Sequence, residues 1–118
     1  MVDYDMNQLK LDITNYSKEE AIRWALELFE NNDILKDDLY DLAKSIIDDW
    51  FNHKIKVSDA RKKAFLMHEQ ARACQDPYQK QIYRAYGHLI ATIHVKDHAL
   101  RCYQYLLKAQ TIKRGRNI

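Results

Sequence analysis

Hydrophobic residues return every three or four positions through most of this chain, a spacing that places them on one side of an α-helix. The longest such series covers residues 35–50: Leu35, Leu39, Leu42, Ala43, Ile46, Ile47 and Trp50. The chain has only two glycines and one proline, which favours long helices with short connections over a turn-rich β-structure. The pattern therefore predicts an all-α, single-domain bundle of about five helices built from antiparallel helix hairpins.

Polar residues beside these series predict where the helices begin and end. Ser17 and Glu20 have the spacing of a capping box at the start of the first helix. Asn31 and Asn32 are expected to end it, because asparagine tolerates the left-handed conformation. The predicted N-caps of the next three helices are Asp33, then Ser58 or Asp59, then Asp76 followed by Pro77.

The two ends of the chain lack a clear helical pattern. Leu9, Leu11 and Ile13 alternate with polar residues, a period of two that indicates a short extended arm over residues 1–16. Residues 111–118 carry several basic side chains and are expected to form a frayed C-terminal tail. We assign the helical domain to residues 17–110.

The helix that starts at Pro77 is expected to turn before residue 98. Its buried positions predict another apolar residue near 96 or 97, but Lys96 and Asp97 stand there. This break predicts a turn around residues 94–97, with Asp97 capping the last helix. The alternative is one helix over residues 77–110, about 50 Å long, which exceeds the size of a compact domain of this length.

Charge is unevenly distributed along the chain. Residues 1–50 hold 5 basic and 13 acidic residues, a net charge of −8, whereas residues 51–118 hold 14 and 4, a net charge of +10. The two halves can neutralise each other, bind between copies, or present two different faces to charged partners. Homo-oligomerisation therefore stays open.

Four histidines form the candidate metal set: His68, His88, His94 and His98. His94 and His98 are four apart and would share a face only if the helix continued through them. His88 lies about 120° away from His94 around such a helix. The favoured interpretation is therefore structural histidines and no metal.

Gly87 lies within a helical pattern, where glycine costs about 1 kcal/mol relative to alanine. A close approach between helices would offset that cost. The expected partner is a series of small residues in the preceding helix, Ala60, Ala64 and Ala71.

No motif in the sequence indicates catalysis. No serine or cysteine stands in a recognisable nucleophile turn, and no glycine-rich loop is present to hold phosphate. We therefore predict a protein that is not an enzyme and needs no cofactor. A helical metal-binding domain or small enzyme using the histidines remains the alternative.

A nucleic-acid-binding module is a further alternative. It would use the basic half of the chain, where Tyr78, Tyr83 and Tyr86 stand among Lys80 and Arg84. Tyrosines at these spacings are more typical of core edges, so nucleic acid is not the expected partner.

The expected location is the cytoplasm. Acidic residues open the chain where a secretory signal would be basic. No run approaches the roughly 18 apolar residues of a membrane span, so no membrane association is expected. Cys74 and Cys102 are expected to remain reduced.

Four segments resemble the Imm-5-like putative immunity protein family of bacteria. They are Ser58-Asp-Ala-Arg61, Ala64-Phe-Leu-Met-His68, Arg84-Ala-Tyr-Gly-His88 and Ala91-Thr-Ile-His-Val-Lys-Asp-His-Ala99. Trp24-Ala25, Leu28-Phe29-Glu30 and residues 43–50 resemble the less specific N-terminal half of the family, so the resemblance covers residues 24–108. Its signature residues are Gly87, His88, His94, Asp97 and His98. It implies an all-helical cytoplasmic protein that binds and neutralises a cognate toxin without catalysis.

The charge pattern suggests where such a toxin would bind. Many nuclease toxins are cationic, and the predicted second helix carries acidic residues that would attract them. The expected contact residues are Asp37, Asp41, Asp48 and Asp49, with Tyr40 as an aromatic anchor. Asp48 and Asp49 stand near a helix C-terminus, where acid is unfavourable by roughly 0.3–1 kcal/mol. A solvated surface is the alternative explanation for this charge.

Overall fold

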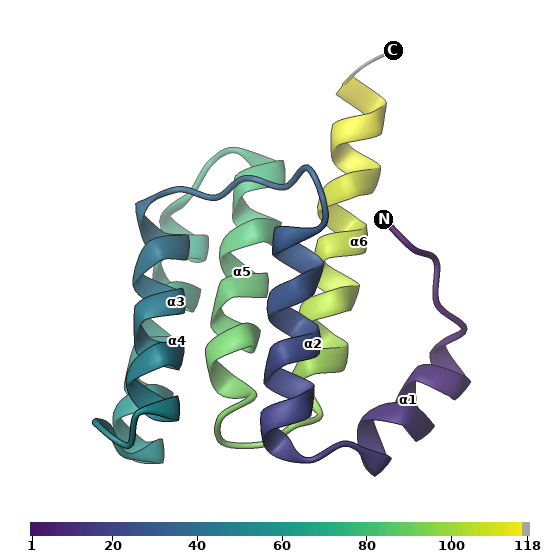
Figure 1. The fold of residues 1–118 in the computed structure, drawn as a ribbon. Coiled ribbons are helices and arrows are strands. Elements are labelled where there is room, and N and C mark those ends of the chain that lie inside the picture. The colour runs from purple at the N-terminus through teal and green to yellow at the C-terminus, as the bar shows by residue number, and fades with distance from the viewer. Residues whose placement is uncertain (117–118) are drawn as a thin grey trace.

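The computed structural model describes residues 1–116, which form six helices and no strand (Figure 1). The helices are α1 (Met6–Asn15), α2 (Lys18–Glu30), α3 (Asp38–Phe51), α4 (Val57–Ala73), α5 (Pro77–Ala91) and α6 (His98–Arg116). The all-α prediction is confirmed, with one helix more than the five expected.

Helix α5 is the centre of the bundle. It packs against α4 on one side and α6 on the other, and it also contacts α2 and α3. In Figure 1, α2 and α3 lie in front, with α4 behind α3. The net charge therefore differs between two layers of the fold. Helices α2 and α3 come from the acidic half of the sequence, and α4, α5 and α6 come from the basic half.

The core is closed by large side chains from several helices. Tyr86 of α5 and Tyr103 of α6 are fully buried, as is Phe29 of α2. The rings of Phe29, Tyr40 and Tyr86 pack together with centroid separations of 5.4–5.7 Å. Aromatic residues bury large areas, so this cluster contributes strongly to holding α2, α3 and α5 together.

The extended conformation expected near the N-terminus is wrong, because residues 6–15 form α1. The carboxylate of Asp5 caps this helix by accepting a hydrogen bond from the amide of Gln8 (3.0 Å). Leu9 and Ile13, four residues apart, are buried, whereas Leu11 is 59% exposed. Leu9 and Ile13 follow the helical spacing of four residues. The apparent period of two came from Leu11, an apolar residue that faces solvent.

Residues 1–5 are attached to the bundle through Tyr103. The amide of Tyr4 donates to the Tyr103 hydroxyl oxygen (2.8 Å), and that hydroxyl donates to the carbonyl of Val2 (3.1 Å). The Tyr4 ring also packs edge-on against Trp24 and Tyr103. One buried hydroxyl therefore holds the start of the chain.

Two helix starts agree with the sequence. Ser17 and Glu20 form the predicted capping box at α2, each side chain bonding to the other's backbone amide at 3.0 Å. The carboxylate of Asp76 caps α5 by accepting from Gln79 (2.8 Å), with Pro77 in the first helical position.

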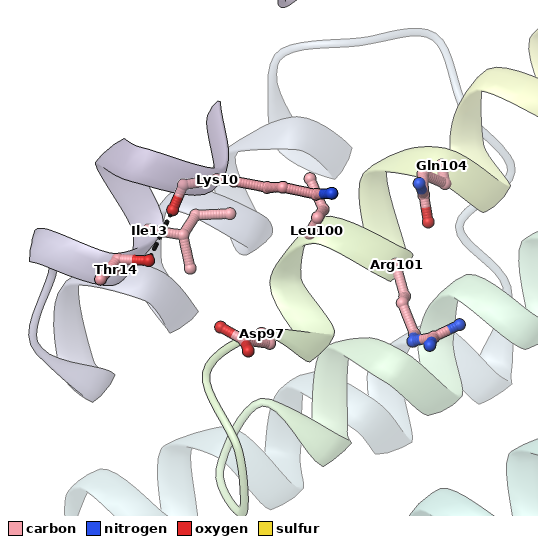
Figure 2. Close-up of a pocket in the computed structure, with 7 residues that line it drawn as sticks. All are labelled: Lys10, Ile13, Thr14, Asp97, Leu100, Arg101 and Gln104. Atoms are coloured by element: carbon pink, nitrogen blue, oxygen red, sulfur yellow. Dashed lines mark hydrogen bonds between the residues drawn. The ribbon is translucent and has the colours of Figure 1, made fainter. Parts of the chain in front are cut away.

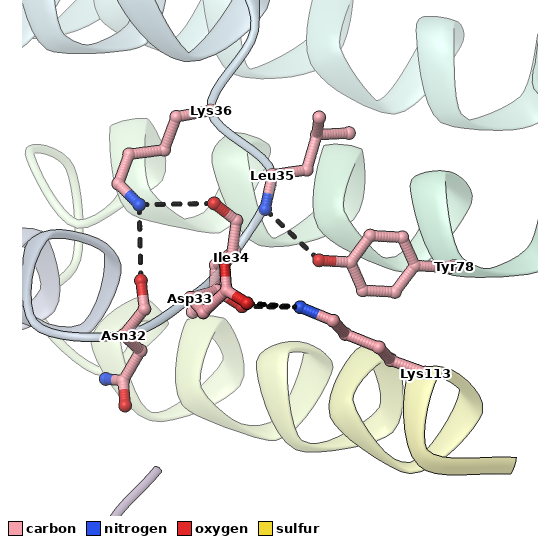
Figure 3. A network of polar contacts seen from close by, with 7 residues as sticks. All are labelled: Asn32, Asp33, Ile34, Leu35, Lys36, Tyr78 and Lys113. Carbon is pink, nitrogen blue, oxygen red and sulfur yellow. Dashed lines mark hydrogen bonds and ion pairs between the residues drawn. The ribbon is translucent and has the colours of Figure 1, made fainter. Parts of the chain in front are cut away.

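Two other predicted caps are wrong. Helix α3 is capped by Asp37, not Asp33, and α4 begins after Lys56, whose amide donates to Asp59 (3.2 Å). Asp33 instead pairs with Lys113, as Figure 3 shows. Helix α2 does end before Asn31, but Asn31 has φ −93°, so no left-handed residue ends it.

The predicted reversal before residue 98 is confirmed, and the single long helix is wrong. Helix α5 ends at Ala91 and α6 begins at His98, with turns between them. Asp97 directly precedes α6, and its backbone carbonyl accepts from Leu100 (3.1 Å). Two polar residues in place of a buried pair were sufficient to indicate this turn.

The helical pattern does not end at residue 110. Helix α6 continues to Arg116, so the frayed conformation expected there is wrong for residues 111–116. Lys113 bonds the Asp33 carboxylate (2.9 Å) and backbone carbonyl (3.1 Å), and Arg116 pairs with Asp76. These contacts hold the end of α6 to distant connections, and Figure 3 shows the one between Lys113 and Asp33. Residues 117 and 118 of the predicted tail lie outside the described residues.

Candidate functional site

Three histidines from three helices meet at the end of the bundle near the α5–α6 turn. We call His68 of α4, His88 of α5 and His98 of α6 the histidine cluster. The Nδ1 atoms of His88 and His98 are 2.9 Å apart. Their ring centroids are 5.1 Å apart with planes inclined by 23°, so the centroid separation exceeds the nitrogen separation by about one ring width. The two rings therefore meet edge to edge, with a hydrogen bond between facing nitrogens.

The His68 ring packs against this pair because Gly87 has no side chain to exclude it. His68 packs edge-on against His88 with centroids 4.9 Å apart. A Cβ on residue 87 would lie 2.8 Å from both Cε1 and Nε2 of His68. The close approach predicted for Gly87 is thus present, but its partner is the His68 ring and not the alanine series. Ala60, Ala64 and Ala71 are buried in α4 as expected.

Burial keeps the histidine cluster neutral. It lowers the pKa of His88 to about 3, assisted by the neighbouring His68, His98 and Arg101. Burial also lowers the pKa of His68, with Arg72 and Arg84 acting in the same direction. The pKa of His98 is lowered by burial and by Arg101, while Asp97 opposes the shift.

His94 does not join the cluster. It is exposed in the turn and lines a hollow of about 150 Å³ together with Arg61, Phe65, His68 and His98. Within residues 1–116, no three His, Cys, Asp or Glu side chains converge as metal ligands. The facing nitrogens of His88 and His98 are at the distance of a shared proton, which is too short for a metal ion to lie between them.

Sequence phasing missed the contact between His88 and His98. Their positions around a single helix place them apart, but the turn over residues 92–97 folds α6 back along α5. The signature residues Gly87, His88 and His98 therefore have a shared structural role, which is the junction of α4, α5 and α6.

The predicted acidic contact residues fall into two groups. Asp37 is half-buried and already bonded: one carboxylate oxygen accepts from the amides of Leu39 and Tyr40 (3.0 and 3.4 Å), and the other from the Tyr83 hydroxyl (2.7 Å). Asp41 and Asp48 are exposed, and Asp49 is half-buried. Only the second group is available for a partner.

Tyr40 lies inside the bundle and not on its surface. It is 4% exposed and packs on Phe29 and Tyr86. Burial raises the pKa of Tyr40 to about 12, with Glu30, Asp41 and Asp48 adding to the effect. The structure therefore gives Tyr40 a core position, and it leaves the acidic face without the expected anchor.

A different aromatic pair lies beside the acidic residues. Trp50 and Phe51, at the end of α3, have centroids 5.3 Å apart and are both half-buried. They line a hollow of about 330 Å³ with Glu19, Arg23, Asn52 and His53. The guanidinium of Arg23 lies 4.6 Å from the centre of the Phe51 ring, a cation–π contact. Sequence reasoning used Trp50 only as a core residue, although its position next to Asp48 and Asp49 was a usable signal.

The tyrosines of α5 do not form a base-stacking surface. The Tyr78 hydroxyl accepts from Leu35 (3.1 Å), Tyr83 donates to Asp37, and Tyr86 donates to the carbonyl of Leu35. Burial and the adjacent Asp37 raise the pKa of Tyr83 to about 12. All three rings thus face the connection between α2 and α3, and the nucleic-acid alternative loses its aromatic component.

A further hollow of about 430 Å³ lies between α1 and α6 (Figure 2). Lys10, Asp97 and Arg101 line it, but Figure 2 shows Lys10 and Arg101 pointing in different directions. Its polar groups have mixed charge and do not converge on one position. We assign it no site.

The cysteines are thiols, as expected. Cys74 donates to the side chain of Gln79 (3.1 Å). Burial raises the pKa of Cys102 far above its ordinary value, and a thiol held neutral is a poor nucleophile.

The comparisons with known proteins give one match. The sequence model of the family described as "Imm-5 like putative immunity protein" matches residues 11–117. No curated protein matches the chain, and no solved structure matches it. In residues 1–116, no helix combines the length and apolar character that a membrane crossing requires.

Proposed function

Because the chain belongs to the Imm-5 like putative immunity protein family, we propose that it binds a toxin protein and neutralises it through surface contact, without catalysis. The observation that carries this proposal is the acidic face of α3, which we define as Asp38, Asp41, Asp48 and Asp49. At 100° per residue these four positions fall within about 100° of the helix circumference. They form one surface and not a ring of charge.

This face supports a contact with a basic partner. Asp38, Asp41 and Asp48 are exposed, so their charges act on an approaching protein before contact. Complementary charge of this kind raises the association rate and selects among partners. A basic nucleic-acid-binding surface of a toxin is the matching chemistry, and covering it would exclude the toxin's substrate.

Trp50 and Phe51 give the acidic face an apolar end. Aromatic residues beside a charged surface are typical of the residues that dominate binding energy in protein interfaces. The Arg23 side chain over Phe51 shows that this ring accepts a guanidinium group. We propose that Trp50, and not the buried Tyr40, is the aromatic residue that contacts the partner.

The test is binding to the product of the adjacent gene. The variant Asp41→Asn, Asp48→Asn, Asp49→Asn removes three charges from the face and leaves the cap Asp37 intact. We expect affinity to fall at least tenfold, mainly through slower association at low salt. The matched control Asp3→Asn, Asp12→Asn, Glu69→Gln makes the same change in net charge away from α3 and should bind like the wild type. Equal binding by both triple variants would refute the role of this face.

A further inference from the structure

We propose that the histidine cluster is an acid-sensitive junction, which holds α4 and α6 on α5 at neutral pH and releases them in mildly acidic solution. The proposal concerns a conformational change of this chain, and it stands or falls independently of any toxin.

The first support is the geometry of the His88–His98 pair. Their Nδ1 atoms face each other at 2.9 Å, a separation at which one nitrogen carries a proton and the other accepts it. If both rings were fully protonated, both Nδ1 atoms would carry hydrogens pointing at each other. The pair must then separate, which removes this contact between α5 and the start of α6.

The second support is the packing around His88. His68 packs against His88 and lies so close to Gly87 that a β-carbon there would force the His68 ring to move. On another side, the Tyr105 ring lies nearly parallel to His88, with planes inclined by 9° and centroids 5.2 Å apart. The neighbouring rings therefore restrict rotation of His88, and a second proton has to be accommodated by movement of His98 at the start of α6.

The third support is the charge that surrounds the cluster. Helix α4 contributes Arg72, α5 contributes Arg84, and α6 contributes Arg101, all of which disfavour added positive charge. The other titratable or charged groups near the cluster are Arg61 of α4, His94 and Asp97 of the turn, and Tyr105 and Lys108 of α6. Asp97 is the one acid in this set. New charge is therefore opposed by three helices and favoured by one exposed carboxylate.

The direction of the pH effect follows from these lowered pKa values. The pKa of His88 is about 3 when folded, against 6.5 for an ordinary histidine. The neutral cluster therefore contributes its full stability above about pH 6.5, and the contribution is lost as pH falls below that value. If opening takes up two protons, the ratio of opened to closed molecules rises about a hundredfold for each pH unit.

Opening would reach beyond the cluster through Lys96. In the turn that joins α5 to α6, the Lys96 ammonium donates to the carbonyls of Thr14 (2.6 Å) and Tyr16 (2.9 Å). Thr14 lies in the last turn of α1, and Tyr16 lies in the connection between α1 and α2. Displacement of the turn would therefore release the N-terminal segment as well.

The experiment follows the imidazole resonances of the wild-type chain by NMR from pH 8 to pH 4. His53, which is exposed and lies outside the cluster, is the reference ring. We expect His68, His88 and His98 to stay neutral and then become charged in one step, together with loss of amide protection in α6. If the three rings titrate separately near pH 6.5 with α6 still protected, or if no transition occurs above pH 4, the proposal is wrong.

A pair of variants gives a second, independent readout. Urea unfolding between pH 7.5 and 4.5 reports how many protons are taken up. His98→Gln removes one titrating ring, and we expect its proton uptake to fall by about one relative to the wild type. His53→Gln is the matched control. It leaves the cluster intact, and we expect its proton uptake to equal that of the wild type. Equal uptake in all three proteins would overturn the proposal, and the wild-type NMR titration decides it if His98→Gln does not fold.

Discussion

The ring of His68 occupies the space in which a side chain at Gly87 would begin, since a Cβ there would lie 2.8 Å from His68 Cε1 and Nε2. The glycine thus allows a half-buried imidazole of α4 to lie directly on the backbone of α5. Because α4 makes extensive contact with α5, the cost of a helical glycine is offset by this approach.

Gly87→Leu should destabilise the protein by about 3 kcal/mol, because the larger side chain would displace the His68 ring that packs on residue 87. The measurement is thermal or urea unfolding followed by circular dichroism. Gly115→Leu is the matched control: it also lies in a helix, but a Cβ there meets nothing within 4 Å. That variant should be neutral or slightly more stable, since leucine is a better helix former than glycine.

A second pair of variants identifies the partner of Gly87. If His68 causes the clash, Gly87→Ala should cost much less in a His68→Ala background than in the wild type. Unchanged unfolding of Gly87→Leu would refute the close contact altogether. Equal costs in both backgrounds would assign the contact to another residue.

Tyr103→Phe should loosen the N-terminal segment. The lost hydroxyl accepts from Tyr4 and donates to Val2, so its removal leaves two backbone groups to find water. We expect a loss of about 1 kcal/mol in the free energy of unfolding. Faster amide exchange or proteolysis at residues 1–5 should accompany it, and a fully protected N-terminal segment would contradict the assignment.

Tyr40→Phe should increase the free energy of unfolding or leave it unchanged. The Tyr40 hydroxyl is buried and has no hydrogen-bond partner among the described residues. Removing an unsatisfied buried polar group relieves a desolvation cost, so the change should be neutral or stabilising by up to about 1 kcal/mol. The same atom is deleted as in Tyr103→Phe, which makes the two variants controls for each other under identical unfolding conditions. A clear destabilisation would show that the hydroxyl has a partner, such as a bound water.

Local chemistry explains which parts of the fold could be predicted from sequence. The capping box at Ser17 and the Asp76–Pro77 start depend on residues within three positions of each other. The turn before α6 followed from two polar residues at positions due to be buried. Such features are decided by neighbours along the chain, so a sequence contains what is needed to find them.

The features that were missed depend on residues distant in sequence. Asp33 and Asp37 are both plausible caps, and the choice of Asp37 is accompanied by a bond to Tyr83, 46 residues away. The last residues of α6 are held by contacts to Asp33 and Asp76. The His88–His98 contact required the length and direction of the turn. The acidic surface was visible in the sequence, but the burial of Tyr40 was not.

Asp37 links the predicted contact face to the stability of the fold, and its substitution should behave unlike that of its acidic neighbours. Asp37→Ala removes the α3 cap and the partner of Tyr83, so we expect a loss of about 1–2 kcal/mol. Asp41→Asn, one turn further along an exposed surface, should stay within about 0.5 kcal/mol of the wild type. Urea unfolding of both variants, with Tyr83→Phe to separate the cap from the hydroxyl contact, checks the difference. Equal stability of Asp37→Ala and Asp41→Asn would show that the cap contributes nothing. If the expected difference is found, weaker partner binding by an Asp37 variant has to be attributed first to lost stability of the fold and only then to lost charge.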